Sequence, residues 1–232
     1  MRLIPLIALP AIALVALSEC AFAPRGPVVS EDRDIDAATS VVLDTSGDLT
    51  ISEREPALII HAPAAVLDRL TSSVTNGVLE LAATPGTPGI LLGRISYELT
   101  LPSLEGLEVN GSGDIDSDVP GDSLTIEING SGDLDIDDID ASSVVVDISG
   151  SGDVELSGRA DEFRLSIDGS ADVRADELDT DAVSVDLDGS GDIEVAASRT
   201  LDVSISGSGS VRYAGSPDVT QEISGSGEVA RL

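Results

Sequence analysis

A four-residue turn motif that recurs down the second half of the chain constrains the fold more than any other feature. The motif reads GSGD or a close variant, and its copies begin at Gly111, Gly130, Gly150, Gly169, Gly189, Gly207 and Gly225. Successive copies are 19, 20, 19, 20, 18 and 18 residues apart. Self-similarity at a short, nearly constant period is typical of a solenoid, in which each repeat is one structural unit covered by its neighbours.

Apolar and polar residues alternate on both sides of these turns. The unit that leads into Gly150 has Val144, Val146 and Ile148 at two-residue spacing, and the alternation resumes after the turn at Val154. Because the side chains of a strand alternate between its two faces, both strands of a unit present their apolar residues to one interior. One unit is therefore a strand, a tight turn, a second strand and a loop.

Two architectures satisfy this pattern: a coil of stacked parallel rungs, and a meander of hairpins with GSG loops. Equal unit lengths and an equivalent apolar triplet in each unit favour the coil, whose parallel return connections are expected to be right-handed. The predicted fold class is therefore all-β, a right-handed parallel β-helix or β-solenoid with rungs of about 19 residues. The turn glycines are interpreted as corners that permit a positive φ.

The repeat is weaker between residues 28 and 102, although Thr45–Ile51 resembles the later turns and predicts an early rung or a pseudo-rung. Ala64–Leu70 could form one or two helical turns. The dipeptide Asn76-Gly77 lies between short apolar segments and predicts a hairpin. Ile95–Leu101 predicts another strand, which ends before Pro102.

These patterns divide the chain into a signal segment, residues 1–23, and two parts of one further domain. Residues 28–102 are predicted to form strands and a hairpin that cap the N-terminal end of the coil, and residues 103–232 are predicted to form the GSG-repeat solenoid, in one continuous domain over 28–232. In the last unit Gln221 and Arg231 stand where other units carry apolar residues. This is the pattern expected of a terminal, capping rung.

Residues 1–23 have the pattern of a secretory signal peptide, with Arg2 followed by an apolar run from Leu3 to Leu17. Two processing sites compete. Ala21-Phe22-Ala23 has the form of a signal-peptidase site, whereas the residues that end at Cys20 resemble a lipobox, which would make Cys20 a lipidation site. We expect an exported protein, in the periplasm, on the outer membrane or outside the cell, and both processing sites stay open.

Charge excludes one class of function. The chain has 43 acidic and 12 basic residues and a net charge of −31, and all of its basic residues are arginines. Phosphate backbones require clustered cations, so nucleic acid is excluded as a partner.

Because Cys20 is the only cysteine, an internal disulfide and a cysteine-based metal site are excluded as well.

The same turn position carries an aspartate in five successive units: Asp114, Asp133, Asp153, Asp172 and Asp192. If the units stack about 4.8 Å apart, neighbouring carboxylates repel each other by roughly 1 kcal/mol in a water-like dielectric. Backbone amides or serine hydroxyls within each turn could offset this repulsion. Hard divalent cations could also offset it, which makes these residues candidate calcium ligands, although no other cofactor is indicated.

A second outward position alternates in charge, which indicates solvated ion pairs between rungs. Its members are Asp135, Glu155, Arg174, Glu194 and Arg212. Aromatic platforms for sugars are scarce, since beyond residue 23 the chain has only Tyr97, Phe163 and Tyr213, and the last two fall on interior positions.

We identify no catalytic residues. The only histidine is His61, and after three apolar residues it is interpreted as a partly packed strand end and not as a general base. Paired carboxylates are too abundant here for any one pair to indicate an active site.

The turns and the segment LTLPSLEGLEVNGSGDI from Leu99 to Ile115 resemble the head GIN domain family of auto-transporter adhesins. The resemblance covers nearly all of the chain after the signal peptide. It implies export, often as a lipoprotein, and a right-handed β-helix with GSG turns, but it assigns no catalytic residues. The sequence therefore predicts a non-enzymatic surface protein, an adhesin or interaction scaffold with an unknown surface ligand or protein partner, which could self-associate. The alternative is a calcium-binding structural module, and an enzyme is the third hypothesis.

Overall fold

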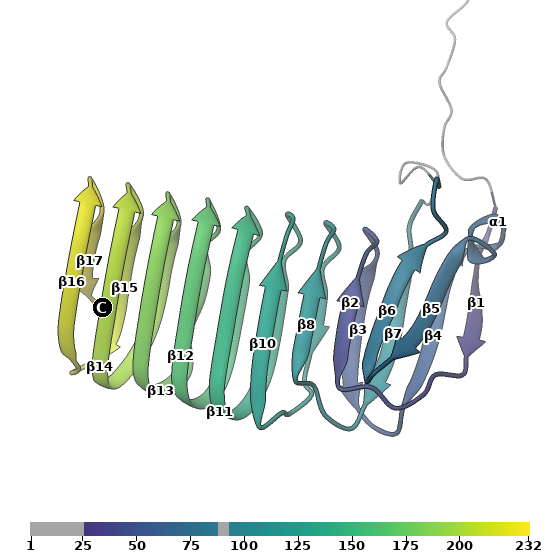
Figure 1. The fold of residues 1–232 in the computed structure, drawn as a ribbon, viewed down its shortest axis with the longest axis horizontal. Coiled ribbons are helices and arrows are strands. Elements are labelled where there is room, and N and C mark those ends of the chain that lie inside the picture. Colours follow the sequence, from purple (N-terminus) through teal and green to yellow (C-terminus); the bar gives the residue numbers. More distant parts are fainter. Residues whose placement is uncertain (1–25, 88–92) are drawn as a thin grey trace, which may run out of the picture.

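The computed structural model describes residues 26–87 and 93–232. The predicted signal peptide and Cys20 lie outside the described residues. Within them the chain forms 17 strands and one short helix, which coil into a long two-layered rod (Figure 1). We call the strands that follow the tight turns layer A, and the strands that lead into the turns layer B.

The coil begins with β8 (Gly106–Val109), β9 (Ile115–Ser117) and β10 (Ser123–Ile128). Four long strands follow: β11 (Leu134–Gly150), β12 (Val154–Gly169), β13 (Val173–Gly189) and β14 (Asp192–Gly207). Each long strand begins in layer A after one turn, bends at the opposite corner and ends in layer B at the next turn. The last strands are β15 (Ser210–Gly215), β16 (Asp218–Gly225) and β17 (Glu228–Arg231).

Successive rungs pair in parallel and in register, which confirms the solenoid and excludes the hairpin meander for this part. Val146 of β11 pairs with Ile126 of β10 on one side and with Leu165 of β12 on the other. All three side chains are buried, with exposed fractions of 0–2%. Equivalent apolar residues therefore stack into one continuous interior between the layers.

Close stacking of the turns explains their glycines better than backbone conformation does. Gly169 and Gly189 have φ values of 153° and 149°, as the positive-φ interpretation requires, but Gly130 does not belong to the positive-φ residues. A Cβ on Gly130 would lie 1.9 Å from the carbonyl oxygen of Gly111 in the turn below. The glycines are corners, as predicted, but Gly130 shows that a positive φ is not what requires glycine at each of them, because the approach of one turn to the next excludes a side chain there.

The early rung consists of β2 (Ser40–Leu43) and β3 (Asp48–Glu53), and its place in the stack is not the one its sequence position suggests. β2 pairs with both β6 (Val78–Ala83) and β8, and β3 pairs with both β7 (Ser96–Leu101) and β9. The rung thus lies between segments that both follow it in the chain (Figure 1).

The remaining N-terminal elements close this end of the rod with antiparallel pairs. They are β1 (Val28–Arg33), β4 (Ala57–Pro63), the helical turn α1 (Ala64–Leu67) and β5 (Leu70–Thr75). β7, β4 and β1 extend layer A, and β5 extends layer B beyond β6. The predicted hairpin is confirmed between β5 and β6, where Asn76 and Gly77 have φ values of 54° and 81°.

The two ends of the rod differ in burial. At the N-terminal end Val66 and Leu67 of α1 are buried. At the other end every residue of β16 is exposed, including Val219 and Ile223 with exposed fractions of 39% and 38%. Within the described residues no strand pairs with the outer edge of β16 or β17.

Candidate functional site: the outer face of layer A

Regular columns of charged side chains cover the outer face of layer A, because every second residue of each strand points away from the interior. The turn column contains the candidate calcium ligands Asp114, Asp133, Asp153, Asp172 and Asp192, and Asp48 of the early rung. Stacking places equivalent members in adjacent rungs, as the sequence predicted.

Backbone amides of the adjacent rung contact the carboxylates of the turn column. The Asp153 N–H donates to Oδ1 of Asp133 at 3.0 Å, and the Asp192 N–H donates to Oδ1 of Asp172 at 2.9 Å. The Ser210 hydroxyl donates to Oδ1 of Asp192. The sequence predicted such donors within each turn, but the structure places them in the following turn, so repulsion between rungs is offset by hydrogen bonds that also join the rungs.

A second column runs beside the first, and its character changes along the rod. Arg174 Nη1 lies 4.0 Å from Glu155 Oε2, and Arg212 Nε donates to Glu194 Oε1 at 3.0 Å. These ion pairs confirm the predicted links between rungs, and such exposed pairs each contribute about 0–1 kcal/mol. Toward the N-terminal side the next two members of the column, Asp135 and Asp116, are both acidic.

The two columns enclose an open trough of about 370 Å³ on the acidic part of this face. Its acidic lining residues are Asp114, Asp116, Asp133, Asp135, Asp153 and Glu155. Arg174 lies at the trough's border as its one lining cation. These carboxylates form a grid on paired strands, with six acidic residues and one arginine lining the trough.

Asp135 lies in the middle of this grid, and its titration reflects that position. Desolvation raises the pKa of Asp135 above its ordinary value, and the neighbouring carboxylates of Asp137, Glu155 and Asp116 raise it further. The ionised form of Asp135 is therefore less favourable in the folded chain than in water.

The carboxylates of layer A are dispersed along the stack and do not converge. Across residues 26–87 and 93–232, no three His, Cys, Asp or Glu side chains are grouped in a way that could hold a metal ion. Calcium binding by the turn column therefore stays a prediction, and its structural basis would be bridging between rungs.

His61 joins three strands on the outer face of layer A. Its Nδ1 lies 2.9 Å from Ser30 Oγ in β1, and its Nε2 lies 2.9 Å from Glu98 Oε1 in β7. The imidazole is partly exposed, in agreement with a packed strand position. Sequence reasoning missed both partners, because Ser30 and Glu98 come from strands 31 and 37 residues away.

The aromatic residues do not form a platform for sugars. Tyr97 and Phe163 each have an exposed fraction of 1%, and Tyr213 packs partly buried against the core. The Tyr97 hydroxyl lies 3.1 Å from Thr45 Oγ1, and desolvation raises the pKa of this buried phenol. Interior positions for Phe163 and Tyr213 confirm the prediction.

Among the described residues no helix has the length and apolar character needed to cross a membrane.

No curated protein matches the chain. Solved structures with the same fold do exist. A putative adhesin from Bacteroides fragilis superposes with a TM-score of 0.86 at 25% identity, over 90% of this chain and 99% of the other.

Two further solved structures show the same fold at lower identity. A putative lipid binding protein from Parabacteroides distasonis has a TM-score of 0.74 at 21% identity, and a putative adhesin from Parabacteroides merdae has a TM-score of 0.66 at 20% identity. Each alignment covers 90% of this chain and 98% of the other. The family described as "Putative auto-transporter adhesin, head GIN domain" matches residues 39–217, which span the stack from β2 to β15. The chain therefore belongs to the head GIN domain family.

Proposed function

We propose that this chain is a non-enzymatic, exported protein of the cell envelope or cell surface that acts as an adhesin or interaction scaffold. The observation that carries the proposal is the carboxylate grid on the outer face of layer A. It is held on paired strands whose turns are hydrogen-bonded from one rung to the next. A family whose name describes adhesins supports the same function.

The grid favours a partner that presents positive charge. A surface with a net charge of −31 attracts cations over distances of about one Debye length, roughly 8 Å at physiological salt. Binding should cost little conformational entropy, because the strands that carry the carboxylates are already held by hydrogen bonds. We therefore infer a cationic protein or surface polymer as the ligand class.

Binding to defined surfaces tests this proposal. A microbalance would compare adsorption of the purified chain on amine-terminated, carboxyl-terminated and neutral surfaces, at low and high salt. We expect saturable, salt-sensitive adsorption on the amine surface only. Equal adsorption on all three surfaces would contradict a charge-specific interaction.

A matched pair of triple variants then locates the binding face. Asp116→Asn, Asp135→Asn and Glu155→Gln together remove three charges from layer A. As the control, Glu108→Gln, Glu127→Gln and Asp147→Asn remove three charges from the outer face of layer B, where these residues pair in register. Only the layer A variant should lose adsorption, and equal losses would mean that overall charge, not this face, determines binding.

The alternative is a calcium-binding structural module, which the column of turn aspartates favours. A cation that bridges adjacent rungs of the folded chain would stabilise the fold, and the gain would rise with the logarithm of its free concentration. Calorimetric melting with calcium and with a chelator separates the two functions. A melting temperature that is the same with calcium and with the chelator would contradict the calcium hypothesis.

Export and anchoring have a direct test of their own. Mass spectrometry of the processed N-terminus distinguishes a diacylglyceryl group on Cys20 from a chain that begins at or near Pro24. An unprocessed Met1 in the exporting host would contradict the signal peptide.

A further inference from the structure

Both ends of the rod carry polar residues at positions where the inner rungs carry apolar ones. In β1, Glu31 pairs with Ile60 and Arg33 pairs with Leu58, so both acidic and basic side chains occupy the inward register of layer A. In β17, Arg231 pairs with Tyr213, and in β16, Gln221 pairs with Val203. These inward register positions are otherwise apolar throughout the long strands of the coil.

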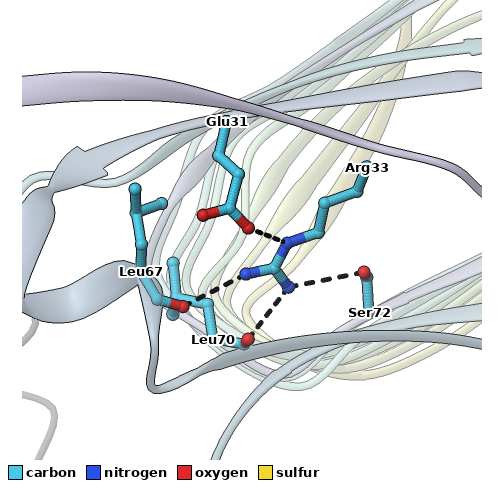
Figure 2. Close-up of polar contacts among 5 residues, drawn as sticks. All are labelled: Glu31, Arg33, Leu67, Leu70 and Ser72. Carbon is cyan, nitrogen blue, oxygen red and sulfur yellow. Dashed lines mark hydrogen bonds and ion pairs between the residues drawn. The ribbon is translucent and has the colours of Figure 1, made fainter.

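At the N-terminal end, the guanidinium of Arg33 spans the gap between the two layers. Its Nη1 donates to the Leu70 carbonyl at 2.9 Å and its Nη2 donates to the Leu67 carbonyl at 3.1 Å, while its Nε donates to Glu31 Oε1 at 2.8 Å (Figure 2). The side chain has an exposed fraction of only 17%. A single arginine thus joins β1 to the corner between α1 and β5 and places a charge over the end of the core.

At the C-terminal end, the exposed Arg231 contacts the corner loop between the layers. Its Nη2 donates to Ser216 Oγ at 3.1 Å, in the loop that leads from layer A into β16. Gln221 lies between Val219 and Ile223 on the inward register of β16. A rung stacked onto β16 and β17 would enclose both polar side chains between the layers.

The last rung otherwise has what stacking requires. Val219, Ile223 and Val229 occupy apolar positions that match Leu201, Ile205 and Val211 in the rung below. The outer edges of β16 and β17 are unpaired within the described residues. Only Gln221 and Arg231 therefore distinguish this rung from one that a further rung could cover.

We propose that these inward polar residues close the ends of the rod against end-to-end stacking of a second copy. An incoming rung would have to bury the Gln221 amide and the Arg231 guanidinium, whose hydrogen-bond partner is a neutral serine hydroxyl and not a carboxylate. Burial of a charge that no opposite charge compensates is strongly unfavourable. Inward-pointing charge is a general means of protecting an exposed strand edge from another chain. The ends then remain free of other copies, and the outer faces are the surfaces available for partners.

The double variant Gln221→Val with Arg231→Val tests the proposal, because it gives the last rung the apolar pattern of the inner rungs. We expect the apparent dissociation constant for self-association, measured by sedimentation of the purified chain, to fall by about a hundredfold or more. Hydrogen exchange should show new protection of the β16 and β17 amides in the associated form. Circular dichroism checks that the fold is intact.

Two matched variants control for side-chain size and charge. Thr220→Val with Ala230→Val changes the outward positions of the same strands, and Gln221→Val with Arg231→Lys keeps the inward charge; both should sediment like the unaltered chain. The proposal is overturned if the variant with both Gln221→Val and Arg231→Val also sediments like the unaltered chain. It is equally overturned if the unaltered chain associates with protection of β16 and β17.

Discussion

In the coil from β8 onward, each rung lies on the rung that precedes it in the chain, whereas in the N-terminal region the rung β2–β3 lies between segments that follow it. The coil is held by contacts about 18–20 residues apart, such as the hydrogen bond from Asn129 to Asn110 at a separation of 19. The early rung is held by contacts such as that from Asn110 to Asp44, 66 residues apart. One region is therefore built by local repetition, and the other by long-range closure that buries the rung on both sides.

This difference implies a gradient of stability along the rod. Leu43 and Leu49 of the early rung are fully buried, whereas the apolar residues of β16 are more than a third exposed. Rungs in a solenoid gain stability from each neighbour they contact, so the rung with one neighbour opens most easily.

The test with the largest expected effect compares an apolar residue of the early rung with one of the last rung. Leu43→Ala removes a side chain packed between Leu81 and Val109, and we expect a loss of about 3–5 kcal/mol in the free energy of unfolding. Ile223→Ala in the last rung should cost only about 1–2 kcal/mol, because the residue is already 38% exposed. Denaturant unfolding of both variants measures the difference, and equal losses would remove the gradient.

A second test asks whether turn stacking stabilises the coil. Gly130→Ala places a methyl group against the Gly111 carbonyl, and the backbone displacement should cost about 2–3 kcal/mol. The control Ser112→Ala alters an exposed residue of the turn below and should stay within about 0.5 kcal/mol. If both variants unfold at the same denaturant concentration, close approach of the turns is not what requires glycine.

A third test concerns the closure of the N-terminal end. Arg33→Ala leaves the Leu67 and Leu70 carbonyls without their charged donor, so we expect a loss of about 1–2 kcal/mol. Hydrogen exchange should quicken in β1 and α1 and stay unchanged in β12. Arg54→Ala removes the same charge from an exposed position, and an equal effect there would show that charge and not closure matters.

The smallest effect is expected in the acidic grid. The folded-state pKa of Asp135 is raised, so the folded chain keeps this proton to higher pH than the unfolded chain does, and ionisation lowers stability as pH rises through the folded pKa. Asp135→Asn should therefore stabilise the chain at pH 7, by less than about 0.5 kcal/mol because the site is exposed.

Its pH dependence and a control make this small effect testable. The gain should vanish at about pH 3, well below the ordinary pKa of an aspartate, where the carboxyl is protonated in both states. Asp202→Asn is the control, since Asp202 pairs with Ser184 and Thr220 and not with other acids. A gain that persists at pH 3 would contradict the electrostatic explanation.

The sequence predicts the coil better than the N-terminal region, because the coil is built by local repetition and the N-terminal region by long-range contacts. The inward apolar triplets, the turns and the aspartate column follow from a pattern repeated at one spacing, and the structure confirms them. The wedged position of β2–β3, the partners of His61 and the role of Arg33 depend on pairs of residues more than 30 positions apart. No local pattern marks such pairs.

The sequence by itself determined a stacked β-solenoid, its interior, its tight turns and its acidic exterior, because alternation and period act through neighbouring residues and neighbouring rungs. Only the tertiary structure decided the order of the N-terminal strands and the hydrogen bonds that hold the carboxylates between rungs. It also decided how arginines close the ends. Each of these depends on which backbone groups remain unpaired once the chain has folded, and a hydrogen-bond donor can satisfy them from any distance along the sequence.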